Sequence, residues 1–355
     1  MNKENTKDML RAAFVDRDGV LIYEPQDTYQ IDSLGKLKIL PGVIEGLQRI
    51  QKDGYKLVMT SNQDGLGTAS YPSDAFEAVQ SAFLASLKEQ GITFYKIFIC
   101  PHTPEDNCAC RKPKTGLLCD FLKNEPVDRD KSFVVGDRES DMELAKNIGV
   151  RAYRMETNGQ FPRIASVDRS TKETSVFVQC NLDGQGQFTI DTGLKFLDHM
   201  LEQFSKHSLI DLVIRANGDL YIDEHHTVED IGLTTAKALA TALGERRGIT
   251  RYGFLLPMDD TLVEVAIDLG GRPYSVFNAD FKREKVGDLP TELVEHFFRS
   301  VADELKANIH INVRYSRNEH HKIEAIFKAF AKSMNAAVSI DTRLRGELPT
   351  TKGTV

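Results

Sequence analysis

The sequence contains two copies of a short motif whose residue types are those of a metal site. His225-His226-Thr227-Val228-Glu229 recurs as His320-His321-Lys322-Ile323-Glu324, in a chain with nine histidines. On a helix, residues four apart share a face, whereas neighbours point about 100° apart. His225 and Glu229 can therefore bind one ion while His226 points toward another. Imidazole combined with carboxylate suits zinc, manganese, iron or nickel.

The similarity between the two regions extends beyond this motif. His199 precedes the first copy by 26 residues, and His296 precedes the second by 24. Each is followed by an amphipathic helical pattern, a strand-like run and then an H-H-x-x-E motif that begins a long helical pattern. This order indicates an internal duplication. Six histidines and two glutamates suffice for two sites of three imidazoles and one carboxylate each, with positions left open for a substrate.

Acidic and hydroxyl side chains follow strand-like runs in the first part of the chain. The apolar runs are Ala12–Val15, Lys56–Met59, Lys96–Ile99 and Phe133–Val135. The polar runs are Asp16-Arg17-Asp18-Gly19, Thr60-Ser61-Asn62-Gln63 and Gly136-Asp137-Arg138-Glu139-Ser140-Asp141. Helical patterns from Pro41 to Gly54 and from about Asp74 to Gly91 separate the strands, which predicts a doubly wound α/β fold with a parallel sheet. Because chemistry in such folds lies at the carboxyl ends of the strands, we expect the polar runs to meet.

Length and charge narrow the classes of protein. The 355 residues suit two domains of roughly 150 to 200 residues, and a stretch without sustained periodicity lies between Val150 and Arg169. We expect domains at 1–166 and 167–355. The formal net charge of −7 gives no support to nucleic-acid binding. Neither a membrane-length apolar run nor the apolar core of a signal peptide is found, so we expect no membrane partner and a cytoplasmic location.

Residues 10 to 150 resemble the haloacid dehalogenase superfamily of phosphatases through these polar runs, with Lys112 as the third motif. The resemblance implies that Asp16 attacks phosphorus to form an aspartyl-phosphate. Asp18 would protonate the leaving alkoxide and then activate water. Magnesium bound by Asp16, the Asp18 carbonyl and Asp137 would supply counter-charge. Ser61 and Lys112 would hold the phosphate oxygens.

A cysteine-rich loop precedes Lys112. Cys100, His102, Cys108 and Cys110 offer three thiolates and one imidazole, a closed tetrahedral set typical of structural zinc. Zinc would thereby position one wall of the phosphatase site. Free cysteines beside a chance histidine are the alternative interpretation. Combined with D-R-D-G, this loop narrows the resemblance to histidinol-phosphate and heptose-bisphosphate phosphatases.

The chain from about residue 168 onward resembles imidazoleglycerol-phosphate dehydratase. The matching segments are Arg169-x-Thr171-x-Glu173-Thr174, Leu197-Asp198-His199-Met200-Leu201, both H-H-x-x-E motifs, Gly271-Arg272-Pro273, His296-Phe297-Phe298-Arg299-Ser300 and Thr350-Thr351-Lys352-Gly353. The resemblance implies an α+β fold of two duplicated units, each with helices on one face of a small sheet. It also implies two manganese ions per site, bound by His199, His225, His226, Glu229, His296, His320, His321 and Glu324.

The same resemblance gives the chemistry of this second region. The proton lost from the glycerol carbon beside the imidazole ring is not acidic, so its removal needs a place for the electrons. An imidazolate that bridges two metal ions provides one. Glu173 is expected to transfer the proton, and His207 and Lys328 to orient the substrate. A phosphate grip is expected from Arg251, Arg272, Lys352 and the hydroxyls of Thr350 and Thr351.

The entire chain therefore resembles the bifunctional enzymes of histidine biosynthesis, with small phosphate esters as substrates. The resemblance also implies a large octahedral homo-oligomer formed through the dehydratase domain, with metal ligands drawn from neighbouring subunits. Two other hypotheses remain: a heptose-bisphosphate phosphatase fused to an unrelated metal domain, and a non-catalytic metal-binding scaffold. A scaffold needs no nucleophile, so the intact phosphatase motifs weigh against the second hypothesis.

Overall fold

The computed structural model describes residues 9–344 and 346–352, and the chain divides into two compact units after Pro162. The expected division after residue 166 falls inside the first strand of the second unit, because that strand already pairs at Ile164. None of the described helices is long and apolar enough to cross a membrane.

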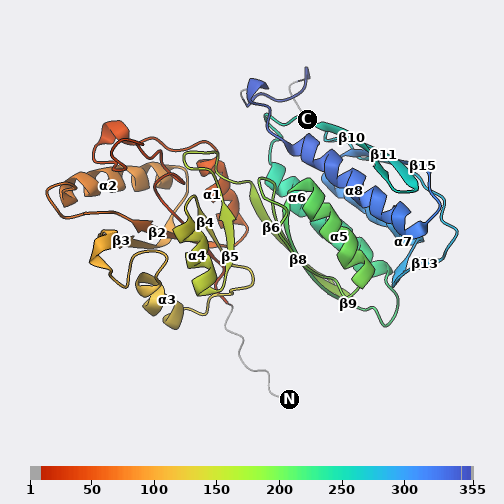
Figure 1. Ribbon diagram of the computed structural model, residues 1–355, viewed down its shortest axis with the longest axis horizontal. Helices are drawn as coiled ribbons and strands as arrows, with labels where there is room; N and C mark the ends of the chain where they lie inside the picture. Colours follow the sequence, from red (N-terminus) through yellow and green to blue (C-terminus); the bar gives the residue numbers. More distant parts are fainter. Residues whose placement is uncertain (1–8, 345, 353–355) are drawn as a thin grey trace, which may run out of the picture. The chain divides into compact units, whose positions relative to one another are not determined.

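The first unit contains a five-stranded parallel sheet with strand order β3-β2-β1-β4-β5 (Figure 1). The strands are β1 (Ala12–Val15), β2 (Lys56–Asn62), β3 (Phe94–Cys100), β4 (Phe133–Gly136) and β5 (Arg151–Arg154). The first four confirm the predicted strands. Their continuous apolar runs reflect burial on both faces, since every residue of the central strands β1 and β4 is buried. The half-polar edge strand β5 was not predicted.

Helices pack on both faces of this sheet. They are α1 (Val43–Lys52), α2 (Ser73–Glu89), α3 (Cys119–Asn124) and α4 (Glu139–Ile148), with 3-10 turns at Leu34–Lys36, Pro104–Asp106 and Gly116–Leu118. Helices α3 and α4 share one core with Phe14 and Val134. On the opposite face, Gln80 of α2 contacts the sulfur of Met59. This is the doubly wound arrangement expected from the sequence.

The second unit contains one sheet topology twice. The first sheet comprises β6 (Ile164–Ser170), β7 (Thr174–Asn181), β8 (Phe188–Asp191) and β9 (Asp211–Gly218), in the order β6-β7-β9-β8. The second comprises β10 (Tyr252–Met258), β11 (Thr261–Asp268), β12 (Tyr274–Asn278) and β15 (Asn308–Tyr315), in the order β10-β11-β15-β12. In both sheets the last pairing is parallel and the others are antiparallel. This repeated topology confirms the predicted duplication. A small hairpin of β13 (Lys285–Val286) and β14 (Leu289–Pro290) is added in the second copy.

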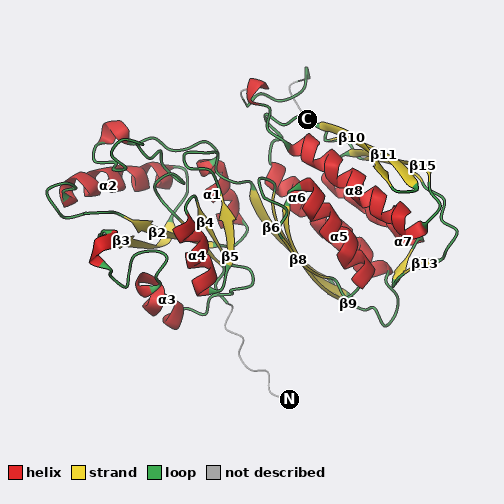
Figure 2. Cartoon of the chain, viewed as in Figure 1, coloured by secondary structure: helices red, strands yellow, loops and turns green. Residues whose placement is uncertain are grey.

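The helices of this unit lie between its two sheets (Figure 2). They are α5 (Lys195–Ser208), α6 (His225–Leu243), α7 (Glu292–Leu305) and α8 (Glu319–Val338), and a 3-10 turn follows at Thr342–Leu344. Helices α5 and α6 pack on the first sheet, and α7 and α8 on the second. The two layers meet with α6 against α7 and α5 against α8, as in the stacked pair of Phe204 and Phe330. The start of each H-H-x-x-E motif therefore lies at the beginning of a helix that faces the other copy.

Candidate active sites and metal centres

Three carboxylates converge at the carboxyl ends of β1 and β4. Asp16, Asp137 and Asp141 are buried, and one oxygen of each lies within 4.8 Å of the others. Lys112 enters this cluster, with its Nζ 2.8 Å from Asp16 Oδ1 and 2.6 Å from Asp141 Oδ1. Its ammonium also donates to the carbonyl of Thr60 (2.9 Å). Two of the expected polar runs and the expected lysine thus meet as predicted.

The electrostatics of this cluster suit a divalent cation. Burial raises the pKa of Asp137, and it raises that of Asp141 to about 6 although the Lys112 ammonium opposes the shift. Burial alone would lower the pKa of Lys112, but the charges of Asp141 and Asp16 hold it above its ordinary value. Asp137 Oδ2 accepts a hydrogen bond from Thr157 (2.6 Å), whereas its buried Oδ1 has no hydrogen-bond partner among the described residues. Such an oxygen is costly unless a cation or water binds it, so the donor set fits magnesium.

A short chain of hydrogen bonds links Asp18, in the polar run after β1, to Ser61, near the end of β2. The Gln63 amide donates to Asp18 Oδ2 (2.6 Å) and to Ser61 Oγ (2.7 Å). On the other side, Nε of the fully buried Arg17 lies 3.2 Å from Asp18 Oδ1, without hydrogen-bond alignment. Burial raises the pKa of Asp18, and Arg17 and Gln63 oppose the shift. A carboxyl with a raised pKa is suited to donate a proton. Gln63 stands in a predicted polar run, but its bridging role was not predicted.

A cavity of about 90 Å³ is lined by Asp16, Asp18, Ser61 and Lys112, among others. Its wall also contains an ion pair that was not expected from the sequence: Arg138 Nη2 lies 2.5 and 2.6 Å from the two carboxylate oxygens of Glu24. Burial raises the pKa of Glu24 to about 7, and Arg138 opposes the shift. Arg111, also at the wall, donates to Asp64 (3.1 Å). Compensating charges therefore surround the cavity.

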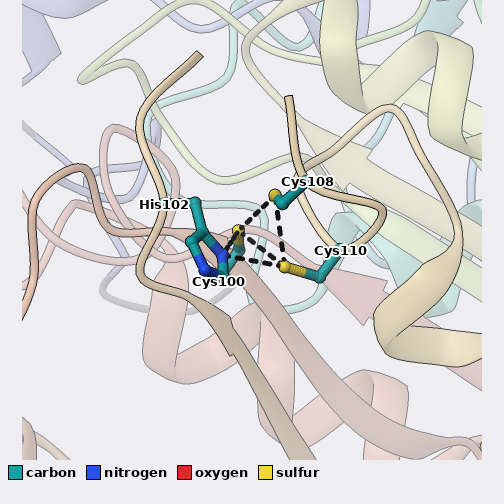
Figure 3. A group of neighbouring side chains, drawn as sticks. All are labelled: Cys100, His102, Cys108 and Cys110. Atoms are coloured by element: carbon teal, nitrogen blue, oxygen red, sulfur yellow. Dashed lines mark hydrogen bonds between the residues drawn. The ribbon is translucent and has the colours of Figure 1, made fainter. Parts of the chain in front are cut away.

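The four predicted zinc ligands form one cluster (Figure 3). The Sγ atom of Cys110 lies 3.2 Å from that of Cys100 and 3.3 Å from that of Cys108, and His102 Nδ1 lies 3.1 Å from Cys110 Sγ. Tetrahedral zinc with bonds of about 2.3 Å places sulfur ligands roughly 3.8 Å apart, so the donor set fits zinc after a small expansion.

The cysteine loop is tied to the sheet just beyond this cluster. Asn62, at the end of β2, accepts a hydrogen bond from the backbone N–H of Lys112 (3.0 Å) and donates to its carbonyl (3.3 Å). An ordered loop therefore fixes the backbone from which the Lys112 side chain enters the carboxylate cluster.

The second unit holds two ligand triads, and each combines both copies of the duplicated region. Glu229 Oε2 lies 3.8 Å from His225 Nε2 and 3.5 Å from His296 Nε2. The Nε2 atom of His296 is buried and has no hydrogen-bond partner among the described residues. An imidazole nitrogen in that state fits a metal ligand.

The other triad takes its H-H-x-x-E residues from the second copy and its single histidine from the first copy. Glu324 Oε2 lies 3.4 Å from His320 Nε2, and His199 completes the set. The single histidine of each copy thus joins the H-H-x-x-E motif of the other copy, because α7 packs on α6 and α5 packs on α8. The sequence did not predict this exchange.

His226 and His321 lie outside the two triads, so the expected sets of three imidazoles and one carboxylate are not formed within one chain. Their rings are turned 85° and 89° from those of their neighbours. The Nδ1 atom of His226 lies 3.1 Å from Asp219, and that of His321 lies 2.7 Å from Asp260. These contacts raise the pKa of both histidines. The two aspartates occupy ordinary turn positions, so no sequence signal distinguished them.

The remaining predicted residues are brought together only in part. Glu173 is exposed in the β6–β7 turn, with Oε2 3.9 Å from His226 Nδ1. Lys328 Nζ lies 2.7 Å from Glu324. Burial lowers the pKa of His207, and the charge of Lys328 contributes. Both predicted orienting residues therefore lie near one triad.

The expected phosphate grip is not assembled within the chain. Arg251 binds Asp268 (Nη2 to Oδ2, 2.9 Å) and donates to the carbonyl of Pro349 (3.0 Å), just before Thr350 and Thr351. Arg272 is exposed, and no contact joins it to that group within the described residues. The backbone N–H of Lys352 donates to Thr350 Oγ1 (3.1 Å), and Gly353 lies outside the described residues.

Comparisons with known proteins cover both units. The family model for imidazoleglycerol-phosphate dehydratase matches residues 192–334, and that for polynucleotide kinase 3 phosphatase matches residues 11–159. The histidine biosynthesis bifunctional protein HisB of Stenotrophomonas maltophilia is 48% identical, over 96% of this chain and 98% of its own. That of Spirosoma linguale is 45% identical, over 97% and 100%. The solved imidazoleglycerol-phosphate dehydratase of Staphylococcus aureus is 40% identical over 50% of this chain and 99% of its own, with a TM-score of 0.46.

The similarity to the bifunctional relatives covers almost the entire chain and therefore both units. The two family models match separate units, as expected for two activities in one polypeptide. The chain therefore belongs to the family of histidine biosynthesis bifunctional proteins.

Proposed function

We propose that the first unit hydrolyses L-histidinol phosphate to L-histidinol and inorganic phosphate. The observation that carries this proposal is the position of Asp16, whose carboxylate contacts Lys112 Nζ (2.8 Å) at a cavity that Asp18 also lines. Asp16 attacks phosphorus, the bond to the histidinol oxygen breaks, and Asp18 gives its proton to the leaving alkoxide. Asp18 then takes a proton from the water that hydrolyses the aspartyl-phosphate, which restores both carboxyl groups.

Magnesium would be held by Asp16, the carbonyl of Asp18 and Asp137. When bound, it would offset the negative charges of the carboxylates and the phosphate. Ser61 and Lys112 would hold the phosphate oxygens. Because Gln63 already donates to Ser61 Oγ, the Ser61 hydroxyl can direct its own proton to the phosphate.

The second unit would dehydrate imidazoleglycerol phosphate to imidazoleacetol phosphate. The two triads supply ligands that suit manganese, and metal ions there would bind the substrate's imidazole and stabilise negative charge that develops on it. Glu173 removes the carbon-bound proton, and hydroxide leaves from the neighbouring carbon. His207 and Lys328 orient the substrate. The phosphate would be held by Arg251, Arg272, Thr350, Thr351 and Lys352.

Two imidazoles remain to complete the metal sites, and they support a large homo-oligomer. His226 and His321 lie outside the triads of their own chain, so each is available to a triad of a neighbouring subunit. Assembly would also bring Arg272 toward the phosphate group of another chain. We expect the dehydratase activity to sediment with the oligomer in analytical ultracentrifugation coupled to an assay of the fractions. An active monomer would contradict the shared site.

The cysteine cluster is proposed as a structural zinc site that holds the Lys112 loop. Replacing Cys108 by serine should remove zinc and lower kcat/KM for histidinol phosphate about 10- to 100-fold, because Lys112 loses its support. Dehydration should be unchanged. The control is Cys119→Ser, which removes an exposed cysteine outside the cluster. Zinc content by mass spectrometry and phosphate release test the proposal, which fails if Cys108→Ser retains both.

Five cysteines without a disulfide suit a reducing compartment such as the cytoplasm.

Purified, metal-replete protein tests the proposed pair of activities directly. Imidazoleglycerol phosphate should yield imidazoleacetol phosphate, and histidinol phosphate should yield inorganic phosphate. Faster hydrolysis of a heptose bisphosphate than of histidinol phosphate would instead identify the first unit as a heptose-bisphosphate phosphatase. Absence of both reactions would favour a metal-binding scaffold.

A further inference from the structure

The turn that carries Glu173 has a counterpart in the second copy. Glu173-Thr174 precedes and begins β7, and Asp260-Thr261 precedes and begins β11. Asp260 Oδ1 lies 2.7 Å from the ring nitrogen of His321. Glu173, in contrast, stands 3.9 Å from His226. Two equivalent carboxylates thus behave differently, and the difference needs a physical cause.

Part of the cause is a competing carboxylate. In the first copy, Asp219 follows β9 and occupies His226 Nδ1 at 3.1 Å. In the second copy, the residue that follows β15 is Ser316, whose hydroxyl bonds Thr261 instead (2.8 Å). His226 therefore receives its orienting carboxylate from a different strand, and the carboxylate of Glu173 is not used for that purpose.

The other part of the cause is a tether between the Glu173 turn and helix α6. Arg169 Nε donates to Asp230 Oδ1 (2.6 Å), and the Thr174 hydroxyl donates to Asp230 Oδ2. Asp230 thus binds the end of β6 and the first residue of β7. Inside the turn, Thr171 Oγ1 accepts the backbone N–H groups of Glu173 (3.2 Å) and Thr174 (2.9 Å).

This tether is specific to the first copy and adjoins the metal site. Asp230 is mostly buried and directly follows the triad residue Glu229 on α6. The residue at the same place in the second copy, after Glu324, is Ala325, which has no hydrogen-bonding side chain. The carboxylate that binds the turn is therefore a divergence between the two copies, and it lies where the turn and the metal helix meet.

We infer that Asp230, with Arg169 and Thr174, is a positioning group that fixes the Glu173 carboxylate in register with the metal-binding helix. The inference rests on the proposed role of Glu173 in proton transfer. Charge-assisted bonds to both carboxylate oxygens hold the two strands of the hairpin against one rigid helical residue. A displacement of about 1 Å in a proton-transfer group can lower the rate about 100-fold, so a fixed turn has a kinetic consequence.

The test compares two threonine variants of the full-length protein. Thr174→Val removes the hydroxyl that binds Asp230 and keeps the side-chain shape. The control is Thr235→Val, because Thr235 Oγ1 is buried on α6 and has no hydrogen-bond partner among the described residues. We expect Thr174→Val to lower the dehydratase kcat about 10- to 100-fold with little change in KM or metal content. Thr235→Val should match the parent.

Two further variants separate positioning from support of the fold. Arg169 is partly exposed, with 43% of its side chain accessible, so Arg169→Gln should fold and reproduce the loss in kcat. In a Glu173→Gln background, Thr174→Val should cause no additional loss, because a tether that acts through Glu173 has nothing left to position. Phosphate release from histidinol phosphate by the same chain reports the amount of active first unit, and metal content reports the integrity of the sites in the second unit.

Each outcome decides the inference. Non-additive losses at constant metal content support it. If the fold-losses in kcat from Thr174→Val and Glu173→Gln multiply in the double variant, the inference is overturned in favour of a purely structural tether. The same holds if Thr174→Val loses activity because it loses metal. An inactive Glu173→Gln with fully active Thr174→Val and Arg169→Gln also overturns it and leaves the role of Glu173 intact. An active Glu173→Gln overturns the proposed role itself.

Discussion

Asp16→Asn is expected to lower phosphate release from histidinol phosphate by at least about 10³-fold and to leave dehydration of imidazoleglycerol phosphate unchanged. The amide keeps the shape of the side chain but cannot attack phosphorus, so no aspartyl-phosphate can form. The substitution also removes one of the charges that hold Lys112 Nζ (2.8 Å) and one of the proposed magnesium ligands. Both reactions are measured on one preparation, with inorganic phosphate and imidazoleacetol phosphate as readouts.

A matched substitution tests whether the charge change alone has this effect. Asp120 is exposed in the first turn of α3, so Asp120→Asn removes the same charge away from the cavity. It should retain both activities. If Asp16→Asn still released phosphate rapidly, Asp16 would not be the nucleophile. If it abolished both reactions, the two units could not be catalytically independent.

Glu173→Gln is expected to have the reverse effect, a loss of about 10² to 10⁴ in the dehydratase kcat with phosphate release unchanged. A glutamine cannot accept the carbon-bound proton, and general base catalysis contributes about that factor. Because Glu173 lies outside both triads, the metal content should stay constant. Steady-state kinetics combined with metal analysis of the same protein checks both statements.

The control for this variant is Glu245→Gln. Glu245 is exposed after α6, and its described ion pair is with Arg247, so its amide should leave both rates unchanged. Loss of metal from Glu173→Gln would show that the carboxylate supports His226 and does not carry the proton. Full dehydratase activity would exclude Glu173 from the reaction.

The sequence predicted the first unit well because its signals are local. Strands buried on both faces must be continuously apolar, so Phe14-Val15 and Val134-Val135 were recognisable. The polar residues that follow them share one sheet edge by the geometry of parallel strands, which brought Asp16 beside Asp137. The edge strand β5 contains two arginines among four residues and lacks the apolar run, so it was missed.

In the second unit, the sequence by itself determined the ligand types and the duplication, because spacing along a helix places His225 and Glu229 on one face. Only the tertiary structure decided which of these residues come together in one triad. Packing of α7 on α6 brings His296 to Glu229, and packing of α5 on α8 brings His199 to Glu324, so each triad exchanges one histidine between copies.

Tertiary structure also decided which side chains support these sites through hydrogen bonds. Asp219, Asp230 and Asp260 are unremarkable in sequence, since aspartate is common in turns and on exposed helices. Their roles depend on hydrogen-bond partners that strand pairing and helix packing bring from distant parts of the chain, such as Arg169 for Asp230. Local patterns encode residue type and periodicity, whereas a hydrogen bond depends on a position in space that only the folded core defines.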